Sequence, residues 1–180
     1  MKLKTSVFLC LGAAAVISGS ANAEFLWDMY TGVSMGIGAQ TVFQPGRDDT
    51  HSAQSFGALF GADIPFVRTE LEYDYLHEYD SRAHLGMFNA YFKIPELVIK
   101  PYVGGGVGFM FAGRDSEHDI KFDTTMAYQA MLGVTLDVPK LPFKFDVEGR
   151  ALYVPDICTR DGGTPDLLHY EARFKLRYMF

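Results

Sequence analysis

Apolar and polar residues alternate one by one along four stretches of this chain, and the alternation continues almost to the last residue. In the clearest stretch, 168–180, Leu, Tyr, Ala and Phe at the even positions are separated by His, Glu, Arg and Lys at the odd positions up to 177. The stretches 29–40, 67–79 and 143–154 show the same pattern. A period of two is that of a β-strand, whose successive side chains point to opposite faces. The chain is therefore predicted to be all-β.

Weaker alternation predicts four more strands, which brings the total to eight; they lie at about 55–64, 85–94, 99–112 and 124–137. Three connections are short and contain proline, at 64–66, 94–97 and 138–142. Four connections are longer and polar, at 44–54, 78–84, 113–123 and 155–167. Eight strands with short turns on one side and longer loops on the other are typical of a transmembrane β-barrel. The predicted fold is an eight-stranded antiparallel up-and-down transmembrane β-barrel with a closed, charge-filled interior.

Such a barrel turns its apolar face to lipid and its polar face to the lumen. The inward positions of the predicted strands then hold eight acidic and seven basic residues, a near balance that charges buried in a narrow barrel require. The lumen charge network is predicted to consist of Arg68, Glu70, Glu72, Asp74, Lys144, Asp146, Glu148, Arg150, Glu171, Arg173, Lys175 and Arg177. Because eight strands enclose room for side chains only, no open channel is expected. A water-soluble sandwich with the polar face outside remains an alternative.

Aromatic residues gather near both ends of the predicted strands, as in the interfacial girdles of membrane barrels. One group is Trp27, Phe66, Phe92, Phe143, Tyr178 and Phe180. The other group is Phe43, Phe56, Tyr75, Tyr79, Phe109, Phe111, Tyr153 and Tyr170.

The N-terminus is predicted to be a secretory signal peptide. Lys2 and Lys4 precede an apolar stretch at 7–17, and Ala21 and Ala23 form a small-residue cleavage site. Residues 1–23 would be removed, leaving 24–180 as the barrel domain. The leader holds two of the sixteen basic and none of the 22 acidic residues, so the mature net charge is 14 minus 22, or −8. An acidic exported protein is not expected to bind nucleic acid.

Three segments resemble a known group of proteins. The terminal segment 170–180, which ends in Phe, is similar to the sorting motif of Gram-negative outer-membrane barrels. Segments 100–108 and 129–134 are similar to parts of the opacity-protein and OmpA-like family of eight-stranded barrels, without the peptidoglycan-binding domain. The resemblance implies an integral protein of the outer membrane, with both termini in the periplasm and a structural or adhesive role rather than one fixed activity. It also implies that the assembly machinery recognises Tyr170, Phe174, Leu176, Tyr178 and Phe180.

An enzymatic role is a further alternative. Some small outer-membrane barrels modify lipid A with a rim His and Ser, and here His77 near Ser81, with Glu78 as orienting residue, is the candidate. The spacing of two residues on one strand face is absent, and the adjacent His51 and Ser52 would point to opposite faces. We expect no catalysis, no cofactor and no bound metal in the barrel.

The predicted loops are acidic and all five histidines map to the loop side: His51, His77, His84, His118 and His169. This rim could bind divalent cations that bridge lipopolysaccharide phosphates, or respond to pH, although a solvated crown explains the same composition. The expected partners are outer-membrane lipid, lipopolysaccharide, the assembly machinery and an extracellular molecule bound by the loops. A monomer is expected, and a narrow pore for small solutes or ions is the main alternative function.

Overall fold

The computed structural model describes residues 28–44, 47–78, 81–94, 99–115, 124–137, 141–155 and 166–180. Within these ranges lie eight strands: β1 (Asp28–Gln44), β2 (Arg47–Asp63), β3 (Val67–Glu78), β4 (Ser81–Lys93), β5 (Ile99–Asp115), β6 (Thr125–Asp137), β7 (Phe143–Val154) and β8 (Asp166–Met179). The predicted signal peptide, with Ala21 and Ala23, lies outside the described residues. In the described ranges no helix has the length and apolar character that a membrane crossing requires.

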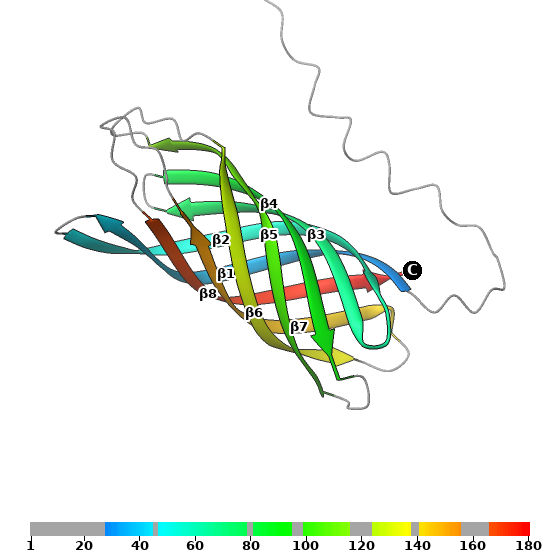
Figure 1. Ribbon diagram of the computed structural model, residues 1–180. Helices are drawn as coiled ribbons and strands as arrows, with labels where there is room; N and C mark the ends of the chain where they lie inside the picture. The colour runs from blue at the N-terminus through cyan, green and yellow to red at the C-terminus, as the bar shows by residue number, and fades with distance from the viewer. Residues whose placement is uncertain are drawn as a thin grey trace, which may run out of the picture.

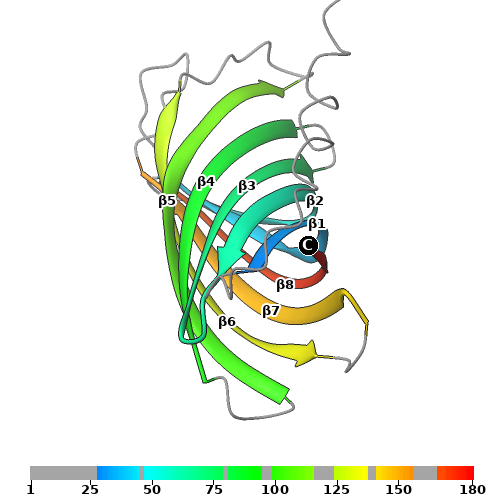
Figure 2. The same cartoon turned by 90° about the vertical axis from the view of Figure 1, so that its right-hand side faces the viewer.

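Each strand pairs antiparallel with the next, and β8 pairs with β1, so the sheet closes into a barrel (Figures 1 and 2). The closing seam runs from the pair Tyr30 and Met179 to the pair Phe43 and Asp166. The predicted eight-stranded up-and-down barrel is therefore confirmed. A sandwich is excluded, because one continuous closed sheet leaves no second sheet to pack against it.

The two ends of the barrel differ. Phe180, the start of β1 and the short connection 64–66 lie at one end, which we call the turn end (Figure 1). The opposite end is the loop end. The predicted loop at 44–54 was wrong, because β1 runs to Gln44 and β2 begins at Arg47 in register with it. Residues 47–52 are all polar in the sequence, so no period of two is visible there, although the strand pairing continues through them.

The predicted loop at 78–84 is also shorter than expected. β3 ends at Glu78 and β4 begins at Ser81, and these two residues are paired in register. The strands therefore extend beyond the 9–11 residues that a tilted strand needs to cross a bilayer.

The outer wall is apolar and the lumen holds the polar groups. Along β8, buried and more exposed residues alternate, so that Glu171, Arg173 and Lys175 are buried while Tyr170 and Phe174 are exposed. This inverts the arrangement of a soluble protein and suits a wall that faces acyl chains. At the turn end the outward aromatics are 38–59% exposed: Phe66, Phe92, Phe143, Tyr178 and Phe180. Near the loop end they are 38–53% exposed: Phe56, Phe109, Phe111, Tyr153 and Tyr170. Trp27, Tyr79 and the side chain of Phe43 lie outside the described part.

The interior has two layers. The charged layer fills the half nearer the turn end and contains the buried ion pairs described below. The apolar layer fills the half nearer the loop end and consists of Leu76, Leu85, Met87, Met110, Ala127, Leu152, Val154 and Leu167. The charge pattern of the sequence does not predict this second layer, although Leu76 continues the inward series that ends in Asp74.

Candidate functional site: the charged layer of the lumen

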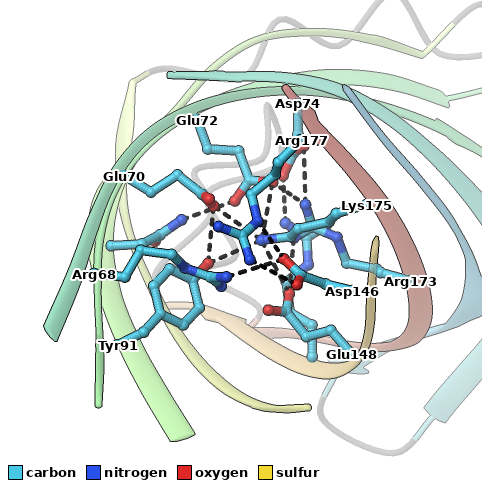
Figure 3. Close-up of polar contacts among 12 residues, drawn as sticks. Arg68, Glu70, Glu72, Asp74, Tyr91, Asp146, Glu148, Arg173, Lys175 and Arg177 are labelled. Carbon is cyan, nitrogen blue, oxygen red and sulfur yellow. Dashed lines mark hydrogen bonds and ion pairs between the residues drawn. The ribbon is translucent and has the colours of Figure 1, made fainter. Parts of the chain in front are cut away.

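Three strands supply most of the charged layer. β3 provides Arg68, Glu70, Glu72 and Asp74, β7 provides Asp146, Glu148 and Arg150, and β8 provides Glu171, Arg173, Lys175 and Arg177. Within each series the residues are two positions apart, so all point to the same side of the sheet. Closure of the barrel brings the acidic series of β3 opposite the basic series of β8 (Figure 3).

Two arginines lie at the border with the apolar layer. Arg150 pairs with Asp74 and, at 2.6 Å, with Glu171. Arg173 pairs with Glu72 and approaches Glu171 through its Nε at 3.3 Å. All five side chains have 0% exposure, so each charge depends on its partners rather than on water for stabilisation.

Lys175 occupies the middle of the layer. Its Nζ lies 2.9 Å from Glu70 and 3.3 Å from Glu148. It also lies 2.9 Å from the hydroxyl oxygen of Tyr91. One ammonium group therefore joins carboxylates from β3 and β7, which are more than seventy residues apart in sequence.

Asp146 lies in the part of the charged layer that adjoins the turn-end rim. Arg177 donates to both of its carboxylate oxygens, at 2.8 and 2.9 Å. Arg68 donates to it at 3.0 Å and Thr135 at 2.6 Å. A carboxylate that receives four donors has its lone pairs satisfied, which offsets the cost of removing it from water.

Three inward tyrosines, which were not among the predicted network residues, support the network. Tyr30 and Tyr91 each donate to Glu70 at 2.9 Å, and Tyr102 donates to Glu148 at 3.0 Å. The guanidinium carbon of Arg68 lies 3.9 Å from the centroid of the Tyr91 ring and 4.6 Å from that of Tyr102. The rings thus contribute cation–π contacts in a dry site. The sequence feature that could have identified them is their position: each lies on the inward-facing side of its strand, an even number of residues from other inward polar residues.

Charges at the turn end form a rim to the network. Asp63 pairs with Lys93 and, at 3.2 Å, with Lys144. Lys100 pairs with Asp137 at 2.6 Å. Lys100 was not among the predicted inward bases; its addition makes eight bases against the eight predicted acids. The structure therefore places all twelve residues of the predicted network in the lumen or at this rim.

The other predicted site residues lie elsewhere. Of the residues predicted to form the assembly signal, Tyr170, Phe174, Tyr178 and Phe180 are 41–57% exposed on the outer wall, and Leu176 lies between them. The histidines do not form one rim: His169 is buried in the lumen beside Glu171, His77 and His84 lie on the outer wall, and His118 is outside the described residues. The prediction that groups His169 with a solvated rim was wrong, because β8 continues below the loops.

The enzyme candidate is not assembled by the strand register. His77 is paired with Arg82, whereas Ser81 is paired with Glu78. The side chains of Glu78 and Ser81 lie outside the described part. Among the described residues, no group of three or more His, Cys, Asp or Glu residues is arranged to hold a metal ion.

Comparisons with known proteins support the same class of fold. No family model matches the chain, and no curated protein matches its sequence. Among solved structures, Neisserial surface protein A superposes with a TM-score of 0.60 at 15% identity, covering 82% of this chain and 95% of that one. The N-terminal β-barrel domain of Pseudomonas aeruginosa OprF superposes with a TM-score of 0.50 at 13% identity, covering 82% and 97%. The fold of this chain is that of the small eight-stranded outer-membrane β-barrels.

Proposed function

We propose that the protein is an integral component of the Gram-negative outer membrane with a structural or surface-interaction role, and that it neither conducts solutes nor catalyses a reaction. The observation that carries the proposal is the filled lumen. In the charged layer, Asp74, Arg150 and Lys175 are fully buried. In the apolar layer, Leu85 and Leu152 have 0% exposure.

The two layers oppose passage for different physical reasons. An ion that entered the charged layer would have to break pairs such as those of Arg150 with Asp74 and Glu171. In the apolar layer, the same ion would lose its hydration without gaining a polar partner. A barrel in which both layers are closed favours a support or display function over transport.

Planar bilayers test this proposal against the narrow-pore alternative. We expect the purified, refolded protein to give no stable conductance steps above those of the bare bilayer in concentrated KCl. An open porin inserted by the same protocol serves as the positive control. Stable steps whose frequency rises with the amount of folded protein would contradict the filled lumen and favour a pore.

The outward parts of the molecule support the remaining features of the proposal. Its apolar wall and two aromatic bands suit insertion as a monomer in lipid, with the loop end outside the cell and both termini in the periplasm. The outward Phe174 and Tyr178 on the last strand, and Phe180 just after it, are available to the assembly machinery. An extracellular partner would meet the connections at the loop end, where the scaffold leaves polar segments free to vary.

Lipid A modification is the second alternative, and the register argues against it. A nucleophile must lie within hydrogen-bond reach of its base. Because Ser81 is aligned with Glu78 and His77 with Arg82, the expected pair of His77 and Ser81 is not aligned across the hairpin. This supports a protein without catalysis.

A further inference from the structure

The outer wall changes character at the loop end of strands β2 to β4. Over most of its height it presents large apolar side chains such as Phe60, Leu71 and Phe88, which are 45–58% exposed. Near the loop end it presents Gln54 on β2, His77 on β3 and Arg82 on β4, all exposed. Among the Lys and Arg residues whose side chains the structure describes, only Arg82 occupies an outward-facing position of its strand. The others face the lumen or its rim.

These three residues form one lateral row, which we call the donor row. Gln54 is paired with His77 across β2 and β3, and His77 is paired with Arg82 across β3 and β4. Cross-strand neighbours of this kind have Cβ atoms about 5 Å apart. The row thus places an amide, an imidazole and a guanidinium side by side, and all three can donate hydrogen bonds.

A groove lies beside the donor row. Its volume is about 640 Å³, and it is lined by Ile37, Gly38, Ser52, Ala53, Gln54 and His77. Two of these residues, Gln54 and His77, belong to the donor row. The groove therefore combines an apolar contribution from Ile37 with hydroxyl, amide and imidazole groups.

An aromatic cluster lies next to the donor row on the outer wall, on the side towards the middle of the barrel. The ring of Tyr75 stacks on His77 with centroids 6.3 Å apart and lies 5.3 Å from the ring of His84. The hydroxyl of Tyr73 lies 2.6 Å from Nδ1 of His84, and Phe111 stacks on His84 at 6.4 Å. The His77 ring therefore packs on Tyr75, which in turn packs on His84, at the boundary between the donors and the apolar wall.

From the loop end towards the middle, the wall thus presents hydrogen-bond donors with a fixed cation, then aromatic rings, then aliphatic and phenyl groups. An amphiphile with an anionic, hydroxyl-rich headgroup has the same order of chemistry. We propose that Gln54, His77 and Arg82, together with the adjacent groove, bind the phosphorylated sugar headgroup of lipid A, whose acyl chains then lie along Phe56 and Tyr75. The site uses the outer-leaflet position of the loop end, so it rests on the membrane orientation given under the proposed function.

Arg82 is the specificity element of this site. A guanidinium binds a phosphate through two parallel hydrogen bonds, a geometry that lysine does not reproduce. His77 and Gln54 add single donors to the phosphate or to sugar hydroxyls. A lipid without phosphate keeps the apolar contacts but loses the charge-assisted ones.

Calorimetric titration of the refolded full-length mature chain in non-ionic detergent micelles tests the proposal. The probes are lipid A carrying its phosphates, the same lipid A after phosphatase treatment, and inorganic phosphate. We expect the phosphorylated lipid A to bind about tenfold or more tightly than the dephosphorylated form, since hydrogen bonds to charged groups are worth roughly one such factor each. The double variant His77→Ala/Arg82→Ala should lose that preference, and Arg82→Lys should keep only part of it.

The matched control is Lys100→Ala, which removes one positive charge at the turn end and should bind lipid A as the wild type does. Folding of every variant is checked by the difference in gel mobility between unheated and heated samples. Equal binding of the two lipid A forms by the wild type would overturn the site without any variant. Unchanged binding by the double variant, or full competition by inorganic phosphate, would also overturn it. None of these results bears on the conductance experiment, so the proposed function stands or fails separately.

Discussion

A single charged side chain in the lumen contributes to stability mainly through its oppositely charged partners, because it is buried away from water. Lys175 is in contact with Glu70, Glu148 and Tyr91 and has 0% exposure. If the ammonium were removed, two carboxylates would remain in a site from which water is excluded. An uncompensated buried charge is far more costly than the modest net stabilisation that an intact buried pair provides.

Lys175→Met should therefore lower the free energy of unfolding by about 3–5 kcal/mol. The measurement is urea unfolding of the barrel in phospholipid vesicles, followed by the loss of β-sheet circular dichroism. Lys100→Met is the control, because the Lys100 side chain at the rim is 23% exposed. Adding Glu70→Gln to Lys175→Met should restore part of the loss. Equal destabilisation by the two lysine variants would show that burial does not set the cost.

Glycines act at the same scale by leaving space for their neighbours. A Cβ added at Gly36 would lie 2.7 Å from Oε2 of Glu171, and one at Gly104 would collide with the Tyr91 ring. The two glycines thus leave room on the inner face for the Glu171 carboxylate and the Tyr91 ring. The sequence indicates only that small residues face inward; it does not show which side chain uses each space.

At the scale of a strand, alternation determines whether each side chain faces the lipid or the lumen. On β6, Leu132 faces outward and is 70% exposed, while Met131 beside it faces the lumen and is 2% exposed. Leu141 is also exposed, at 54%, but it lies just before β7 at the turn end. The two leucines differ in depth rather than in chemistry, which makes them a matched pair.

Leu132→Arg should reduce stability by about 2–4 kcal/mol, the cost of arginine at the bilayer midplane, whereas Leu141→Arg should cost about 0–1 kcal/mol. Both are measured by guanidinium unfolding in vesicles of the same phospholipid. If both variants were equally stable, the outer wall would not be facing hydrocarbon.

At the scale of the whole molecule, closure is the dominant feature. The seam between β1 and β8 joins the two ends of the described chain through a ladder that runs from Tyr30 to Phe43 on one strand. A closed sheet has no edge, so all its backbone hydrogen bonds are made within the barrel, as a bilayer requires. Residues 116–123 and 156–165 are not part of the described strands.

Replacing residues 116–123 and 156–165 with short glycine turns should therefore leave the barrel folded while abolishing binding of any extracellular partner. Folding is measured as a compact, heat-modifiable band from the outer-membrane fraction, and partner binding as adherence of cells that display the protein. Binding that survives both deletions would remove the surface-interaction role from the loops. Loss of the heat-modifiable band would instead show that these segments contribute to barrel stability.

The sequence by itself determined the strand number, the inward and outward faces and the near balance of charge, because each is local information carried by alternation within a strand. Lys175 and Glu70 could both be assigned to the lumen from the alternation within their strands alone. Their contact could not be predicted, because they are 105 residues apart and meet only through the closure and stagger of eight strands. The same reason applies to Tyr91 beneath Arg68, to the apolar layer and to the row of Gln54, His77 and Arg82. These arrangements depend on register between strands, which only the tertiary structure decides.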